Sequence, residues 1–209
     1  MIHRGMERAK IREDGAGITS HRIRRAPIFA VALLCFCAAV AVLPARAQDS
    51  SKPLRASEAV RTQVYVSLEP VPQGRRFEIA VAAQVAPGYH VQANKVLEDY
   101  LIPLTVTVDL PAGFKLLNTS YPKALLKKFP FAEQPMAVYE GRFLVRMTLQ
   151  AESAAAVGPV KLPMTLRFQA CNDQLCLPPA RLPLSAEFTV APAGTAAKKT
   201  HRDIFAGSH

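Results

Sequence analysis

Short segments in which every second residue is hydrophobic recur along most of this chain, and prolines and glycines separate them. A period of two is typical of a β-strand with one buried face, and no stretch shows the longer period of a helix. The pattern indicates about seven strands: Val64–Leu68, Phe77–Val85, Leu104–Val108, Phe114–Thr119, Phe143–Leu149, Leu162–Phe168 and Leu182–Val190. Such a series predicts an all-β protein that forms a single antiparallel sandwich.

Prolines and one polar insert add local detail to this pattern. Pro103, Pro163 and Pro183 lie in or beside expected strands. Proline has no backbone N–H to donate, so these strands should be edge strands or should begin at the proline. The long insert after the fourth strand contains one expected helical turn, at Lys123–Lys128.

The amino terminus has the pattern of a secretory signal peptide. Arginines precede the hydrophobic run Ile28–Leu43, and Ala45-Arg46-Ala47 supplies small residues for a cleavage site. The run has 16 residues, against about 20 for a membrane helix, so an uncleaved anchor is the alternative. We therefore expect a cleaved signal peptide and export to the periplasm. The expected organisation is a signal peptide at 1–47, a flexible lead-in at 48–59, the sandwich at 60–190 and a disordered tail at 191–209.

Charge and motifs exclude several classes of function. The whole chain carries a formal charge of +10, but residues 48–209 hold 18 basic and 13 acidic residues and so carry +5. The basic residues are scattered, without interleaved aromatics, which argues against nucleic acid binding. Paired carboxylates, a glycine-rich phosphate loop and a serine–histidine arrangement are absent as recognisable motifs.

The candidate reactive residues of the mature chain are two cysteines that lie close together in the sequence. Cys35 and Cys37 lie in the hydrophobic run and would leave with the signal peptide, which leaves Cys171 and Cys176 in the mature chain. Asn172 favours a tight turn between them, so a disulfide is sterically plausible. A loop this short stabilises a fold by about 2 kcal/mol, against about 4.7 kcal/mol for a loop of about 100 residues. This favours a bridge that opens and closes, but a structural bridge remains the alternative.

These residues resemble a known family. Gln169–Pro179 (Q-A-C-N-D-Q-L-C-L-P-P), together with Gly88-Tyr89-His90 and Tyr100–Pro103, is similar to the amino-terminal periplasmic domain of the thiol:disulfide interchange protein DsbD, over Val60–Val190. The resemblance implies an immunoglobulin-like β-sandwich with one redox-active cysteine pair. It also implies electron transfer from a membrane thiol-disulfide transporter to periplasmic thioredoxin-fold proteins, with no cofactor other than the Cys171–Cys176 disulfide.

The resemblance also suggests roles for single residues. It implies that Cys176 attacks the partner and that Cys171 resolves the mixed disulfide. In the family a short loop caps the disulfide, and Tyr121 stands at the matching place, with Phe129 and Phe131 as substitutes. The alternative for all three is ordinary packing.

Two further residues stand where the family has an aromatic near the cysteines, namely Tyr89 and His90. A protonated His90 would lower the pKa of a nearby thiol, and its alternative is a hydrogen-bonded surface residue. A zinc site made of His90, the two cysteines and a fourth ligand lacks the second close cysteine pair of strong zinc sites. We therefore expect no bound metal.

Two hypotheses follow for the whole chain, which we expect to be monomeric. The first is an exported redox relay; because no multi-helix segment follows the domain in this sequence, its electron donor would be a separate protein. The second is a non-catalytic immunoglobulin-like module that binds another protein and holds a locked disulfide.

Overall fold

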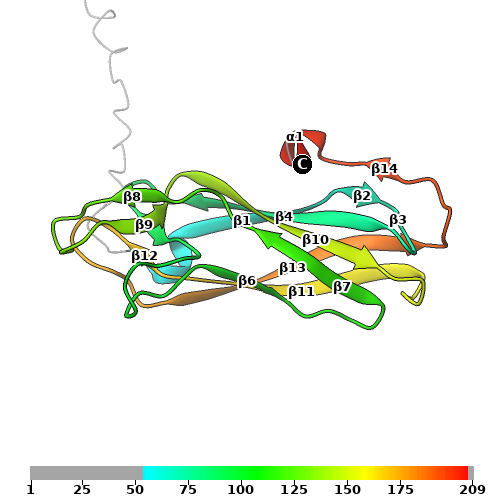
Figure 1. Cartoon of the computed structure of the whole chain (residues 1–209), viewed down its shortest axis with the longest axis horizontal. Helices are drawn as coiled ribbons and strands as arrows, with labels where there is room; N and C mark the ends of the chain where they lie inside the picture. Colours follow the sequence, from blue (N-terminus) through cyan, green and yellow to red (C-terminus); the bar gives the residue numbers. More distant parts are fainter. Residues whose placement is uncertain (1–53, 207–209) are drawn as a thin grey trace, which may run out of the picture. The chain divides into compact units, whose positions relative to one another are not determined.

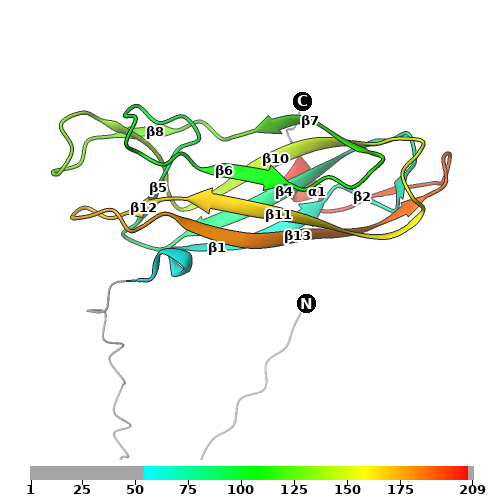
Figure 2. The same ribbon diagram turned by 90° about the horizontal axis from the view of Figure 1, so that it is seen from below.

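Two four-stranded sheets form the body of the protein, which we describe from a computed structural model covering residues 54–206. The first sheet has the order β1 (Val60–Val66), β4 (Arg76–Val85), β10 (Arg142–Ala151) and β7 (Phe114–Ser120). The second has the order β3 (Val71–Pro72), β13 (Ala180–Ala191), β11 (Gly158–Phe168) and β6 (Thr105–Val108). Neighbouring strands are antiparallel, except for β3 beside β13. The layers face each other (Figures 1 and 2), which confirms the predicted immunoglobulin-like sandwich.

The alternating hydrophobic residues form the core between these sheets. β4 contributes Phe77, Ile79 and Val81, and the rings of Phe77 and Phe188 meet across the layers with 5.1 Å between centroids. Each fully buried side chain of this size contributes about 1.5–3 kcal/mol. The core therefore makes a firm platform for the loops at the ends of the strands.

A third sheet extends from one end of the sandwich and carries the cysteines. Its order is β12 (Ala170–Cys171), β5 (His90–Gln92), β9 (Met136–Tyr139) and β8 (Leu125–Lys127). The helical turn expected at Lys123–Lys128 is wrong. Leu125–Lys127 instead pairs with Met136–Val138, because cross-strand hydrogen bonds outweigh local helix propensity.

The prolines sit where the sheets tolerate them. Pro103 precedes β6, and β13 meets β3 only at Val190–Ala191, so Pro183 lies outside that ladder. The expectation is wrong for Pro163, because β11 is an inner strand that begins before it. Its carbonyl accepts from the N–H of Asp109 on the side of β6, whose ladder begins only at Met164. The missing N–H of Pro163 thus falls at the end of the pairing with β6, one residue before the ladder at Met164.

The carboxyl-terminal segment is folded onto the domain up to Ala206, where the sequence analysis expected disorder from Ala191 onward. β14 (Lys198–Lys199) pairs with β2 (Leu68–Glu69), and a short helix, α1 (Arg202–Phe205), follows. Ile204 is buried and its carbonyl accepts a hydrogen bond of 2.9 Å from Arg146. These contacts supply the burial that the composition did not suggest. Residues 207–209 lie outside the described residues.

The expected signal peptide at 1–47 and the first half of the expected lead-in, residues 48–53, also lie outside the described residues. The last residues of the lead-in contain a 3-10 helix, η1 (Ala56–Glu58), and Ala59 after it is fully buried. Within residues 54–206, no helix is long and hydrophobic enough to cross a membrane.

Candidate redox site

The cysteine loop begins where β11 ends. After Phe168 the chain forms the two-residue strand β12, then turns so that Cys176 returns beside Cys171. The side-chain oxygen of Asn172 accepts hydrogen bonds of 2.9 Å from the N–H groups of Gln174 and Leu175. The turn is thus held by the asparagine that the sequence analysis identified as turn-forming.

A disulfide joins Cys171 to Cys176, with an S–S bond of 2.02 Å. The pairing that the sequence made plausible is therefore present in the structure. The two residues differ in exposure: Cys171 is 0% exposed, whereas Cys176 is partly exposed. Thiol–disulfide exchange needs direct access of a thiolate to a sulfur. Of the two cysteines, Cys176 is therefore the more accessible residue.

Strand register determines what surrounds the buried sulfur. Cys171 lies opposite His90, and the N–H of Gln92 donates to the carbonyl of Gln169 at 3.1 Å. Directly opposed residues share one face of a sheet. The side chains of His90, Gln92, Gln169 and Cys171 therefore lie on one face, which we call the site face.

Gln92 contacts the sulfur of Cys171 directly. Its side-chain Nε2 donates to Sγ of Cys171 at 3.5 Å, and the residue is fully buried. Its neighbour across the strands, Gln169, binds backbone instead: it accepts from the N–H of Ile102 at 3.2 Å and donates to the carbonyl of Leu177 at 3.4 Å. The sequence analysis missed Gln92; the signal was a second polar residue, two positions after His90, on a buried strand.

A stack of aromatic rings lies on His90, one of the residues of the site face. Phe129 lies against His90 with 4.0 Å between centroids, and Phe131 lies against Phe129 at 5.6 Å. Phe129 is 3% exposed and Phe131 is 42% exposed, so the stack runs from the buried strand to the surface. Phe129 belongs to a small hydrophobic cluster, separate from the main core, with Leu101, Met136 and Val138. Because Cys171 and His90 share a face, Phe129 lies on the side that carries the buried sulfur.

The other two aromatic candidates are not part of this stack. The hydroxyl of Tyr121 accepts a hydrogen bond of 3.2 Å from the N–H of Val106 on β6, and its ring packs on the main core. Tyr89 is half-buried against the same core. Phe129 and Phe131, rather than Tyr121, are therefore the candidates that stack on His90, and we call these two residues the cover.

Burial determines the charge of His90. The pKa of His90 is lowered from 6.5 to about 4, chiefly by desolvation; Glu140 and Asp173 oppose this decrease, and Lys127 adds to it. His90 is therefore neutral near pH 7 and does not act as the imidazolium considered from the sequence. Its Nε2 atom is buried and has no hydrogen-bond partner among residues 54–206.

A cleft of about 400 Å³ opens beside the disulfide loop. Its lining includes Tyr89, His90, Asp173 and the ion pair between Lys127 and Glu140, whose Nζ and Oε1 are 2.6 Å apart. Charged groups thus lie beside the cysteine loop, although none lies within it except Asp173. The sequence analysis did not identify Lys127 or Glu140, because nothing local marks them.

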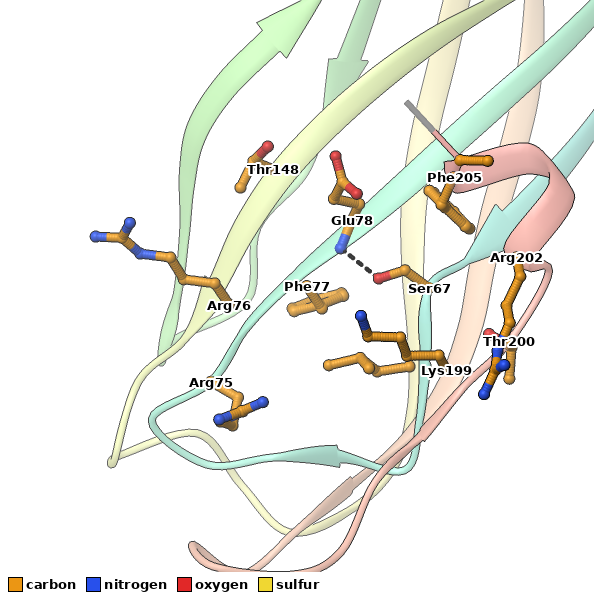
Figure 3. Close-up of a pocket in the computed structure, with 12 residues that line it drawn as sticks. Ser67, Arg75, Arg76, Phe77, Glu78, Thr148, Lys199, Thr200, Arg202 and Phe205 are labelled. Carbon is orange, nitrogen blue, oxygen red and sulfur yellow. Dashed lines mark hydrogen bonds between the residues drawn. The ribbon is translucent and has the colours of Figure 1, made fainter. Parts of the chain in front are cut away.

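Another cavity, of about 760 Å³, lies under the carboxyl-terminal segment (Figure 3). Its walls come from β4 and from the segment that holds Lys199, Arg202 and Phe205, and it contains neither cysteine. In Figure 1, β14 and β12 lie toward opposite ends of the domain. Within residues 54–206, no group of three His, Cys, Asp or Glu side chains is arranged to hold a metal.

Fold and site together define a class: an immunoglobulin-like β-sandwich domain with a disulfide in a loop at one end, suited to thiol:disulfide interchange. A family model described as "Thiol:disulfide interchange protein DsbD, N-terminal" matches residues 53–183. The chain belongs to this family.

Two solved structures are similar to the chain. One is the crystal structure of the Neisseria meningitidis DsbD n-terminal domain in the reduced form, with 18% identity and a TM-score of 0.40 over 70% of this chain and 94% of that chain. The other is the N-terminal periplasmic domain of ScsB from Proteus mirabilis, with 11% identity and a TM-score of 0.41 over 61% of this chain and 46% of that chain. No curated protein matches the chain.

Proposed function

We propose that this protein is a periplasmic electron relay whose working group is the Cys171–Cys176 disulfide. Its donor is a membrane thiol-disulfide transporter, and its acceptors are periplasmic thioredoxin-fold proteins. The observation that carries this proposal is the asymmetry of the bridge, in which Cys176 is partly exposed and Cys171 is fully buried on the site face. Family membership supports the same chemistry.

The exchange proceeds through a mixed disulfide. A thiolate of the donor attacks Sγ of Cys176; a new S–S bond forms, the Cys171–Cys176 bond breaks, and its electron pair leaves on Sγ of Cys171. The second donor thiolate then attacks the donor sulfur of the mixed disulfide and releases Cys176. The donor is oxidised to a disulfide and this domain is reduced to a dithiol.

The onward step repeats this sequence in the other direction. Cys176 as a thiolate attacks an acceptor disulfide, and Cys171 then attacks Sγ of Cys176 and releases the reduced acceptor. Asp173 in the loop disfavours a thiolate nearby. We therefore infer that the free dithiol reacts slowly until a partner docks, which limits loss of electrons to other oxidants.

The cover has a role in this scheme. Phe129 and Phe131 stack on the face that holds the buried sulfur. We infer that this stack keeps small oxidants and reductants from Cys171 and that a docking partner displaces the exposed ring of Phe131.

A competing function is favoured by one observation. The complete burial of Cys171 is also what a locked structural disulfide would show, in a module that only binds another protein. The two functions differ in reduction potential, because structural disulfides usually lie below about −300 mV.

The equilibrium reduction potential of the purified protein, measured in dithiothreitol redox buffers, tests the relay. We expect a value above about −300 mV and reduction while the domain stays folded. A lower value, or reduction only on unfolding, would reject the relay and support the binding module.

A further inference from the structure

One buried amide in the site has a sulfur atom as its partner. Gln92 is 0% exposed, and its Nε2 lies 3.5 Å from Sγ of Cys171. Within residues 54–206 its Oε1 atom is buried without any hydrogen-bond partner. The side chain of Gln92 is therefore committed to Cys171.

This arrangement is unfavourable while the bridge is closed. A disulfide sulfur is a weak acceptor, and a buried amide without a good partner costs free energy. A methionine has a similar size and would fill the site without that cost. A buried polar group left so poorly satisfied requires an explanation outside the resting structure.

The explanation lies in the open bridge. We propose that Gln92 is a catalytic residue that stabilises the sulfur of Cys171 when the disulfide is reduced. The proposal rests on the relay function above. When a donor thiolate attacks Cys176, the electron pair of the broken bond moves to Sγ of Cys171, which becomes a thiolate. The N–H of Gln92 already points at this atom, so the developing charge meets a strong, pre-positioned hydrogen bond.

The same amide also serves the protonated form. Once the Cys171 thiolate takes up a proton, its S–H becomes a donor, and Oε1 of Gln92 becomes its acceptor by rotation of the amide. A neutral amide offers both functions to one sulfur. Other groups nearby are less suited, because His90 is neutral and Lys127 is held by Glu140 at 2.6 Å.

The chain supplies a matched control for this role. Gln169 lies opposite Gln92, between β11 and β12, and on the same face. Its amide binds the backbone of Ile102 and Leu177 rather than a sulfur. Replacing each glutamine by methionine therefore removes an amide from the same face of the site, with loss of the sulfur contact only for Gln92; Gln169 is the more exposed of the two.

The test measures the acidity of Cys171 and the speed of its release. In a Cys176→Ser background, the ultraviolet absorbance of the thiolate against pH gives the pKa of Cys171. In the unsubstituted background, stopped-flow mixing with dithiothreitol gives the rate of reduction. We expect Gln92→Met to raise the pKa of Cys171 and to slow reduction about tenfold. We also expect it to lower the equilibrium constant for reduction about tenfold, which corresponds to about 30 mV for two electrons.

The controls separate this role from a structural one. Gln169→Met should lower thermal stability but leave the pKa of Cys171 unchanged, and oxidised Gln92→Met should melt at or above the parent temperature. An unchanged pKa and rate in Gln92→Met, or an equal change in Gln169→Met, would overturn the proposal. So would loss of folding in both Gln92→Met and Gln92→Leu, because the amide would then be structural. If dithiothreitol cannot reduce the folded parent, the relay itself fails, while the pKa of Cys171 still reports on Gln92.

Discussion

The imidazole of His90 stacks on the phenyl ring of Phe129, with 4.0 Å between centroids and 17° between ring planes. His90 lies on β5, directly opposite Cys171 on β12. The stacked pair of His90 and Phe129 therefore links the cover to the strand beside the buried cysteine. The stack needs a neutral imidazole, because a charged ring would lose its hydration at this depth. Protonation of His90 and integrity of the site are therefore linked.

This linkage predicts a loss of stability at acidic pH. Burial lowers the pKa of His90 from 6.5 to about 4, so between these values the unfolded chain binds a proton that the folded domain does not. The free energy of unfolding should therefore fall as the pH decreases through this window, by about 2–3 kcal/mol. Urea unfolding at neutral pH and near pH 4 measures the change.

Two variants isolate the contribution of His90. His90→Phe keeps an aromatic ring against Phe129 and should remove this part of the pH dependence, whereas His201→Gln, at an exposed site, should keep it. Equal pH dependence in the parent and in His90→Phe would show that His90 is not the group responsible.

The cover should protect the bridge. Phe129→Ala removes a buried ring from the site cluster, and a cavity of this kind costs about 3–5 kcal/mol. Because it also opens the site face, we expect dithiothreitol to reduce the bridge about tenfold faster, which corresponds to about 1.4 kcal/mol in the barrier. Phe131→Ala removes a ring that is 42% exposed and should change stability by less than about 1 kcal/mol.

A main-core variant distinguishes local opening from general loss of stability. Phe114→Leu weakens the aromatic cluster of Phe77, Phe114 and Phe188, away from the cysteine loop. It should lower the midpoint of unfolding without accelerating reduction under native conditions. If Phe114→Leu accelerates reduction as much as Phe129→Ala, the cover has no specific role.

Asn172 should set how firmly the two sulfurs are held together. Its side-chain oxygen accepts two backbone hydrogen bonds, and Asn172→Ala should cost about 1–2 kcal/mol and loosen the turn. In a looser turn the two thiols re-form the disulfide less readily, so the equilibrium constant for reduction of the bridge should rise several fold. Asn172→Asp keeps the acceptor and should retain the stability of the parent, as judged by thermal melting. An equal loss of stability in both variants would show that the side-chain oxygen of Asn172 does not stabilise the turn.

How far the sequence predicts this molecule depends on how local each feature is. The strands follow from alternation within single segments, and the cysteine pair closes a turn that Asn172 favours, so both were predictable. The contact of Gln92 with Cys171 and the stack of Phe129 on His90 depend on the register of strands far apart in the chain, which no local pattern encodes. Likewise, the composition of the tail gave no indication that Ile204 would be buried against the domain.

That tail gives a prediction about the end of the domain away from the cysteines. Truncation after Ala197 removes β14 and α1 and exposes the site covered by Ile204, so we expect a loss of about 2–3 kcal/mol. The reduction potential should stay the same, because the cavity in Figure 3 contains no residue of the redox site. A shifted potential in the truncated protein would instead show that the two ends are coupled.

Single-cysteine variants identify which sulfur meets the partner. Cys176 is partly exposed and Cys171 is not, so Cys171→Ala should leave a reactive Cys176 that accumulates as a mixed disulfide with a thioredoxin-fold protein. Cys176→Ser leaves only the buried Cys171, which should form no such adduct on the same timescale, because a covered thiol cannot reach a partner disulfide. Non-reducing electrophoresis after incubation with an oxidised thioredoxin-fold protein separates the two outcomes. An adduct with Cys176→Ser, and none with Cys171→Ala, would reverse the assigned roles and require the cover over Cys171 to open without a partner.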